Sequence, residues 1–498
     1  MKKRILSILF LVIPMVTFAQ EKGLDQQIDE AFKPISDFFS QVIFFTIPLA
    51  GMDVPFVLLL LVGSALFFTI YFKFPNIFHF KTAINVVRGK YDELDHASAN
   101  PELAIDGDIT DTIKDESEEG EVTHFQALAT AVSGTVGNGN IAGVALAIAL
   151  GGPGATFWMI VCGFLGMSTK FVECTLGVQY RDVGDDGTVY GGPMYYISKG
   201  LKERGFEKFG KVLAVIFAVL CIGASFGGGN AAQSNQAALQ MVSLFGLTGG
   251  SARTIVGIVM MVVVGVIIIG GIKRIASVTS KLVPSMAIIY ILSALVILVV
   301  NFEHIPAAVS SIFFGAFSPE GVTGGFMGVL ILGFRRAVFS NEAGIGSAPI
   351  AHSAAKTNEP STEGIVSLLE PFIDTVVICT MTALVIIVTG VFSGQEGIEG
   401  ARLTSEAFGS VLPWFPYVLA FVAVLFAFST AISWSYYGVK AVTFIFGEVR
   451  SAELIYKIVF CIFAVIGSSL DLEKVIDLSD SALFLMAIPN LIGVYLLA

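Results

Sequence analysis

The chain has 498 residues, of which 55% are hydrophobic and 14% are charged, and its mean hydropathy is +0.80. Soluble domains usually carry about 25% charged residues. Since apolar runs recur along almost the whole length, this composition excludes an ordinary soluble protein and predicts an integral membrane protein with spans of about 20 apolar residues. Much of the acidity behind the net charge of −11 lies in one stretch, 91–121, which is typical of a solvated loop.

The N-terminus has the layout of a secretory signal peptide. Three basic residues at positions 2–4 precede an apolar run from Ile5 to Phe18, and Ala19 ends a plausible cleavage site. The run is short for a membrane span, which favours a signal peptide, 1–19, over a retained first helix. The segment 20–53 is then expected outside the cytoplasm.

Eleven membrane spans are predicted in chain order. The first is 54–72, and a cytoplasmic segment with the acidic stretch, 73–124, follows it. The remaining apolar segments lie at 125–150, 154–179, 211–246, 254–272, 277–300, 320–347, 365–391, 415–446, 453–470 and 476–497. The fold class is therefore all-α and polytopic.

Lysine and arginine are distributed unequally between the two sides of these spans. One side has Lys73, Lys81, Arg88, Lys90, Arg181, Lys199, Lys202, Arg204, Lys211, Lys273, Arg274, Lys281, Lys356, Arg450 and Lys457. The other has little beyond Lys22, Lys33, Arg253, Arg402 and Lys474. The positive-inside rule predicts a periplasmic N-terminus and a cytoplasmic C-terminus. With a signal peptide, this suggests the inner membrane of a Gram-negative type of cell.

Without the first span, the other ten divide into two sets of five, 125–300 and 320–498, joined by an external loop, 301–319. The first member of each set is interrupted by glycines and polar residues, at 133–143 and at 324–344. Non-helical backbone at membrane depth is tolerated only where it lines a cavity or is buried in protein. Interrupted spans at corresponding positions of two halves are typical of a transporter's binding site. The alternative is that the glycines only permit close helix packing.

Several motifs, in order, resemble the alanine or glycine:cation symporter family, also called sodium:alanine symporters. They lie at 135–143, 149–155, 191–196, 333–344 and 434–438, and the resemblance runs from about residue 50 to the end. It implies a five-plus-five inverted repeat of the neurotransmitter:sodium symporter or amino acid-polyamine-organocation type, with one extra N-terminal helix. It also implies sodium-coupled uptake of alanine or glycine by alternating access. Asn138 and Ala337 depart from the residues usual in the family.

A broken helix suits a zwitterionic amino acid, because free backbone amides at a half-helix N-terminus attract a carboxylate. Gly137 and Gly139 would let the ligand approach the backbone closely. We therefore expect the carboxylate at the amides around Gly139 and Asn140, with the Asn138 side chain beside the pocket. The ammonium is expected at a second break, at 331–334.

Bulky and amide side chains are the expected walls of this pocket. Phe334 flanks the predicted second break, and Trp434 lies in mid-span, where a role as an interfacial belt residue is less favoured. Asn230 and Gln233 are further pocket candidates, because polar groups at that depth are costly unless paired or wet. Both amides could instead join helices.

The resemblance also implies where the co-transported sodium binds. In this fold, carbonyls of Ser133 and Val136 would face the hydroxyls of Ser429 and Thr430. The alternative is that these hydroxyls bond back to their own helix. Asn140 could serve a second sodium or the substrate.

Ionisable residues inside the spans give the remaining hypotheses. Arg335, Arg336 and Glu342 are interpreted as gate or structural charges rather than substrate ligands. Proton coupling through Glu370 or Asp374 is the alternative to sodium. The five cysteines show no metal-ligand spacing, and no arrangement of an enzyme or continuous polar pore of a channel is evident. The expected partners are a small neutral amino acid, Na⁺ and the bilayer, with no nucleic acid and no catalytic residue.

Overall fold

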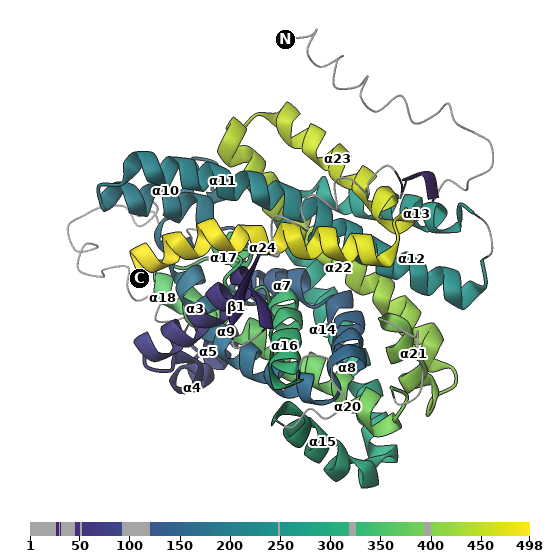
Figure 1. Ribbon diagram of the computed structural model, residues 1–498. Helices are drawn as coiled ribbons and strands as arrows, with labels where there is room; N and C mark the ends of the chain where they lie inside the picture. The colour runs from purple at the N-terminus through teal and green to yellow at the C-terminus, as the bar shows by residue number, and fades with distance from the viewer. Residues whose placement is uncertain are drawn as a thin grey trace.

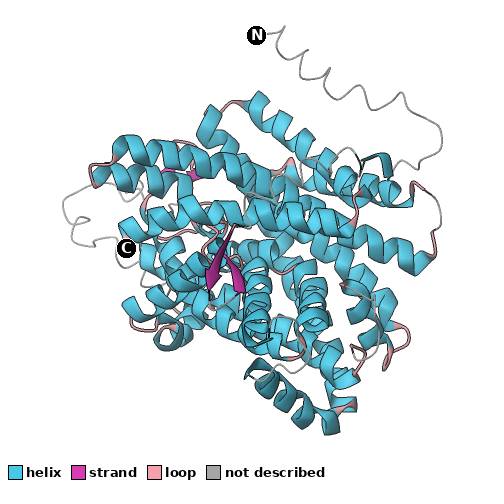
Figure 2. Cartoon of the chain, in the orientation of Figure 1, coloured by secondary structure: helices cyan, strands magenta, loops and turns pink. Residues whose placement is uncertain are grey.

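The computed structural model describes residues 26–28, 30, 45–49, 52–91, 120–247, 250–317, 325–392 and 400–498. The predicted signal peptide and most of the acidic stretch lie outside these ranges. Figure 2 shows that the described chain is almost entirely helical. Two small antiparallel hairpins are formed by β1 (Thr46–Leu49) with β2 (Met52–Pro55) and by β3 (Asp182–Val183) with β4 (Val189–Tyr190).

The helices of the N-terminal part are α3 (Phe56–Tyr71), α4 (Pro75–Phe78), α5 (Phe80–Val87), α7 (His124–Thr135), η4 (Gly139–Gly143), α8 (Val144–Gly151), α9 (Gly154–Gln179), α10 (Pro193–Glu203), α11 (Glu207–Phe226), η5 (Gly227–Ala231), α12 (Ala232–Phe245), α13 (Ala252–Ile268) and α14 (Gly271–Val300). Those of the C-terminal part are η6 (Phe302–His304), α15 (Ile305–Phe317), α16 (Gly325–Asn341), α17 (Ala348–His352), α18 (Pro360–Ser367), α19 (Leu369–Pro371), η7 (Phe372–Cys379), α20 (Thr380–Thr389), α21 (Ala401–Gly409), α22 (Phe415–Phe446), α23 (Arg450–Ser469) and α24 (Leu472–Leu497).

In the described part of the chain, seven helices are long and apolar enough to cross a membrane, and the bent pair of α7 with η4–α8 makes an eighth candidate span. All eight coincide with predicted spans. The other three predicted spans correspond to α3, α13 and α16, which are only 16, 17 and 17 residues long. A membrane-crossing role for these three stays a prediction.

The long helix α11 packs against both α22 and α24, and α15 lies at the edge of the molecule (Figure 1). The helix α15 occupies the segment predicted as an external loop, so that segment is more ordered than its sequence indicated. The first predicted span, α3, packs against α9, α16 and α24. It is therefore an integral part of the packed helices.

The first predicted break is confirmed. Between α7 and η4, residues 136–138 leave the helix, and the two halves meet at 51°. The second break was placed wrongly, because α16 continues without interruption through 331–334 and ends at Asn341. The chain unwinds afterwards, at 342–347, where Glu342 has φ +55° and Gly344 and Gly346 both have φ +89°.

Gly333, which lies within the second break as predicted at 331–334, has a packing role. A Cβ on Gly333 would lie 2.6 Å from the carbonyl oxygen of Ala155 and 2.8 Å from Cβ of Trp158. Gly333 therefore lets α16 approach α9 closely, which is the packing interpretation of such glycines.

Three segments have π-helical geometry: η4, η5 and η7. Such segments are rare and frequently lie at functional sites. Here η4 follows the first break, η5 leads directly into α12, and η7 contains Asp374. All three contribute to or adjoin the site described next.

Candidate functional site

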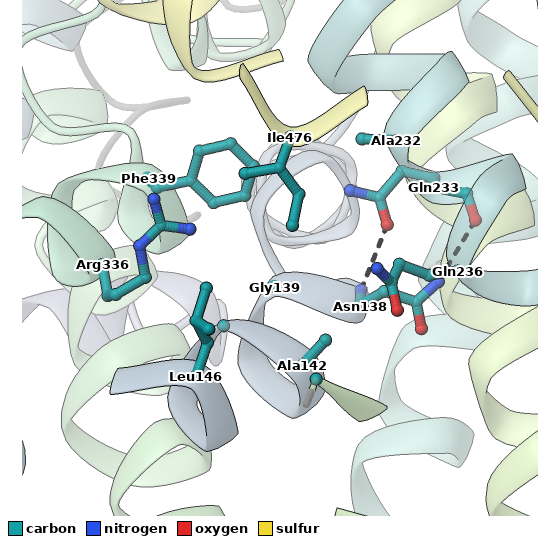
Figure 3. Close-up of a pocket in the computed structure, with 12 residues that line it drawn as sticks. Asn138, Gly139, Ala142, Leu146, Ala232, Gln233, Gln236, Arg336, Phe339 and Ile476 are labelled. Carbon is teal, nitrogen blue, oxygen red and sulfur yellow. Dashed lines mark hydrogen bonds between the residues drawn. The ribbon is translucent and has the colours of Figure 1, made fainter. Parts of the chain in front are cut away.

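A cavity of about 50 Å³ lies beside the first break. Its lining residues are Asn138, Gly139, Ala142, Gly143, Leu146, Ala232, Gln233, Gln236, Arg336, Phe339, Gly400 and Ile476. Figure 3 shows the amide side chains gathered on one side, with Arg336, Phe339 and Leu146 opposite them. Of the two halves of the broken span, only η4–α8 contributes lining residues, and α7 contributes none. The cavity therefore extends from the break toward the α8 end of this span.

Side chains satisfy the backbone amides of the break. The Asn138 amide donates to Oε1 of Gln233 at 3.1 Å, and the Gly137 amide donates to Oδ1 of Asn140 at 2.8 Å. The Asn140 amide donates to the carbonyl of Gly137 at 3.1 Å. The sequence suggested that these amides are free, whereas in the structure each has a hydrogen-bond acceptor. A ligand carboxylate could replace the Gln233 oxygen at Asn138, because both are hydrogen-bond acceptors.

Asn138 is almost completely buried and uses its amide nitrogen to join helices. Its Nδ2 donates to the carbonyl of Ala423 at 3.2 Å and to that of Gln233 at 3.4 Å. Its Oδ1 has no hydrogen-bond partner among the described residues. A buried acceptor without a donor is costly, so Asn138 presents an unsatisfied oxygen at the lining of the cavity, as expected for a pocket residue.

A buried charge cluster closes one side of the cavity. Asp480 on α24 accepts from Nη2 of Arg336 at 2.5 Å and from Nη2 and Nε of Arg335 at 2.7 and 3.0 Å. Arg336 also lies over the ring of Phe339, 5.4 Å from its centroid. The cluster fits the gate or structural role expected for the two arginines, while placing Arg336 on the cavity wall.

The four predicted sodium residues come together where α7 meets α22. The Ser133 hydroxyl donates to the carbonyl of Ser429 at 2.8 Å. The Ser429 hydroxyl donates to the carbonyl of Phe426 at 3.0 Å, so it bonds back to its own helix. The Thr430 hydroxyl is buried without a hydrogen-bond partner among the described residues, and a Cβ on Gly137 would lie 2.8 Å from it. Val136 is fully buried in the break itself.

A second polar cluster lies on the other side of the break. Asp374 is fully buried and accepts from Nδ2 of Asn140 at 2.6 Å, from Ser340 at 2.7 Å and from Thr375 at 2.7 Å. Within the described ranges, no ion pair joins this carboxylate to a lysine, arginine or histidine. Buried charges are normally paired with a counter-charge or bound to a metal ion, so Asp374 has the environment of a cation-binding or proton-binding group.

Three predicted pocket residues lie elsewhere. Phe334 packs edge-to-face on Trp158 and lines an apolar groove between α16 and α3, so it does not close the cavity. Asn230 donates to the carbonyl of Phe460 at 2.5 Å, which is the helix-joining alternative. Trp434 is buried, with its Nε1 3.3 Å from Oε1 of Glu342, and it contacts the second break rather than the cavity.

Sequence reasoning missed Phe339 and Asp480. Phe339 is the aromatic wall of the cavity and lies one helical turn after Arg335 and Arg336. Its ring is close to the break, because a Cβ on Gly139 would lie 3.4 Å from it. Asp480 lies 144 positions after Arg336, and no local spacing indicates that pair. An acid inside the last apolar span was the available signal, because such residues are rare unless paired.

Replacing Asp480 should destabilise the protein. The Asp480→Asn variant removes the only carboxylate that Arg336 contacts among the described ion pairs, leaving a buried guanidinium unpaired. The expected loss is about 3 kcal/mol of unfolding free energy, seen as a lower Tm in detergent. The matched control is Asp471→Asn: the Asp471 side chain is 60% exposed, so its pair with Arg253 at 3.8 Å should contribute little. Equal Tm values for the two variants would contradict this role.

Comparison with known proteins places the chain in a family. The sodium:alanine symporter family matches residues 39–498. The chain is 40% identical to the sodium/alanine symporter AgcS of Methanococcus maripaludis, over 89% of this chain and 92% of that one. It is 36% identical to the probable sodium/glutamine symporter GlnT of Bacillus subtilis, over 76% of each chain.

Among solved structures, MhsT in complex with L-phenylalanine matches with a TM-score of 0.54 at 16% identity, over 75% of this chain and 89% of that chain. This likeness concerns the fold alone. The fold match agrees with the transporter architecture that the sequence resemblance implies. The match over almost the whole length shows that this chain belongs to the sodium:alanine symporter family, whose members are membrane transporters and not enzymes.

Proposed function

We propose that the protein is a sodium-coupled symporter that carries a small neutral amino acid, alanine or glycine, into the cell by alternating access. The relative named a sodium/alanine symporter and another named a putative sodium/proton-dependent alanine carrier support this substrate class. The observation on which the proposal depends is the small cavity beside a broken span, next to the Thr430 hydroxyl, which has no hydrogen-bond partner in the described part of the chain. The proposed setting is the inner membrane, with a periplasmic N-terminus and a cytoplasmic C-terminus.

The dimensions and chemistry of the cavity suit such a substrate. Pockets for drug-sized ligands have volumes of roughly 300–1,000 Å³, so a cavity of about 50 Å³ favours a ligand of few atoms. The substrate carboxylate would accept from the Asn138 amide in place of Gln233. Gly137 and Gly139 leave the backbone accessible there. A methyl group would face Phe339 and Leu146.

The sodium ion, as co-transported cargo, would bind where α7 meets α22. Sodium prefers oxygen ligands, and an unwound segment releases backbone carbonyls for this purpose. We assign the Thr430 hydroxyl and the carbonyls of Ser133 and Val136 to this site. Ser429 would contribute through the α22 backbone, since its hydroxyl is already bonded within its own helix.

We further propose that α7–α14 and α16–α24 are the two five-helix repeats, with α3 as the extra helix. Broken first members in both sets support this arrangement, even though the second break lies later than its sequence suggested. Because the cavity extends toward the α8 end, the proposed orientation makes this conformation open toward the periplasm. The α7 end would then form the closed inner gate.

Uptake of labelled alanine and glycine by proteoliposomes tests the function directly. With an inward sodium gradient we expect saturable uptake of at least one of the two, and background uptake when potassium replaces sodium. Empty liposomes and an excess of unlabelled alanine are the controls. Uptake that is equal in sodium and potassium would refute sodium coupling, and the absence of any uptake would refute the substrate class.

The Thr430→Ala variant tests the sodium site. Loss of one oxygen ligand should raise the sodium concentration for half-maximal uptake about tenfold, which corresponds to about 1.4 kcal/mol. The matched control is Thr430→Ser, which keeps the hydroxyl and should stay within about twofold of wild type, or about 0.4 kcal/mol. A change in the KM for alanine without a change in sodium dependence would move Thr430 from the ion site to the substrate site.

The alternative is proton coupling. The observation that favours it is the buried Asp374 carboxylate, which pairs with no basic group among the residues that the structure describes. Under sodium coupling, an imposed proton gradient in sodium-free buffer should drive no uptake in wild type or in Asp374→Asn. Under proton coupling, wild type would show such uptake and Asp374→Asn would lose it. Ser340→Ala, which keeps the carboxylate and removes one of its donors, is the matched control.

A further inference from the structure

A row of buried charged and titratable side chains lies on and around α7, outside the lining of the cavity. Its members are His124 on α7, Glu363 on α18, His352 on α17, Glu370 on α19 and Lys170 on α9. All but His124 are fully buried, and His124 retains only 11% of its side-chain exposure. Neither the cavity nor the proposed sodium site uses these groups.

Basic and acidic groups alternate along the row. His124 Nδ1 lies 3.3 Å from Oε1 of Glu363, whose Oε2 is 3.5 Å from Nδ1 of His352. On its other side, His352 Nε2 lies 3.8 Å from Oε2 of Glu370, and Oε1 of Glu370 is 2.9 Å from Nζ of Lys170. Each carboxylate therefore lies between two basic groups.

The charges of this row do not balance without bound protons. Lys170 supplies one positive charge against the negative charges of Glu370 and Glu363. Burying an uncompensated charge is costly, so the row needs at least one bound proton, and its two imidazoles are groups that can accept one. The nearby Glu173 accepts from Asn490 and from the amide of Gly344, and adds further acidity.

His124 is the member of the row that reaches the edge of the molecule, and it is the first residue of α7. The dipole of a helix disfavours a positive charge at its N-terminus, so a proton on His124 depends on its contact with Glu363. Conversely, a charged pair is a stronger hydrogen bond than a neutral one. The contact and the proton therefore stabilise each other, as linkage requires.

The half-helix α7 is the element that this contact restrains. It ends at the break, and its 12 residues span roughly 18 Å, so a pivot at 136–138 would displace its His124 end the most. Backbone hydrogen bonds also hold this end: the amides of Glu121 and Val122 donate to the carbonyl of Ala354. Those bonds do not depend on pH, whereas an imidazole changes charge between about pH 5 and 8.

Other charges around α7 are already engaged or exposed. On α22, Lys440 lies 4.0 Å from Glu121. On α5 and α14, Lys81 and Lys281 are exposed. On η7, Asp374 accepts hydrogen bonds near the break. Glu363 is the carboxylate that contacts His124 among the described ion pairs.

We propose that the His124–Glu363 pair is a proton-dependent latch on the inner gate, which holds α7 closed when His124 is protonated. The proposal depends on the proposed transport function and orientation, which place His124 at the cytoplasmic side. Acid on that side strengthens the latch and slows opening. Alkaline pH removes the proton and releases α7, so transport becomes sensitive to cytoplasmic pH.

Uptake into right-side-out vesicles from a bacterial host tests the latch, because the pH of the lumen can be set while the external pH is fixed. Lowering the lumenal pH from 8 to 6 should slow sodium-driven alanine uptake by roughly three- to tenfold. His124→Gln should remove this dependence and remain fast. His124→Lys, charged throughout, should remove it and remain slow. His79→Gln, at an exposed position, should keep the wild-type profile.

Hydrogen exchange of the 124–135 segment supplies a second measurement that does not need uptake. Corrected for intrinsic rates, exchange should be faster at pH 8 than at pH 6 in wild type and equally fast at both in His124→Gln. A pH profile shared by wild type and both His124 variants, or a response to external pH alone, would overturn the latch while leaving the transport function intact. Absence of sodium-driven uptake in wild type would instead refute the function itself.

Discussion

The structure depends on how an unwound backbone is satisfied at membrane depth. Hydrocarbon offers no hydrogen-bond partners, so each amide released at 136–138 must find a protein group or a ligand. Gln233 from α12 and Asn140 from η4 supply acceptors for two of them. The break is therefore held by side-chain acceptors, and a polar ligand could replace them because it offers the same hydrogen bonds.

This arrangement explains why different helices converge on one short segment. On one side, α22 brings the unpaired Thr430 hydroxyl against Gly137, where a side chain would collide with it. On the other, η7 brings Asp374 against Asn140. A single broken span is thus in contact with two polar sites that differ in charge. Among the described residues, one site is neutral and has a hydroxyl without a hydrogen-bond partner, and the other has a carboxylate without a basic partner. Coupling between an ion and a substrate requires such shared contacts, because each ligand must act on the same two-state element.

The sequence predicted the first break because glycines and asparagines in an apolar run are a strong local signal. The same reasoning failed for the second break. At Gly333 the missing side chain serves the contact of α16 with α9, while the true unwinding follows at 342–347. A glycine signals either a packing contact or a break, and only the three-dimensional neighbours distinguish them. Likewise, Lys170 on α9 forms an ion pair with Glu370 on α19, which lies 200 positions later in the chain. Such long-range pairs, including Arg336 with Asp480, leave no trace in sequence spacing.

The two ends of the molecule use buried charge in different ways. Around the cavity, Asp480 forms ion pairs with two arginines whose charge does not vary with pH, so that contact can respond to motion or to a competing carboxylate. At the other end, carboxylates alternate with imidazoles, whose charge does vary near neutral pH. Alternating access needs one gate closed while the other is open. Under the proposed orientation, a gate built of permanent charges and a gate built of titratable charges would respond to different conditions on the two sides of the membrane, and only the inner side would be controlled by pH.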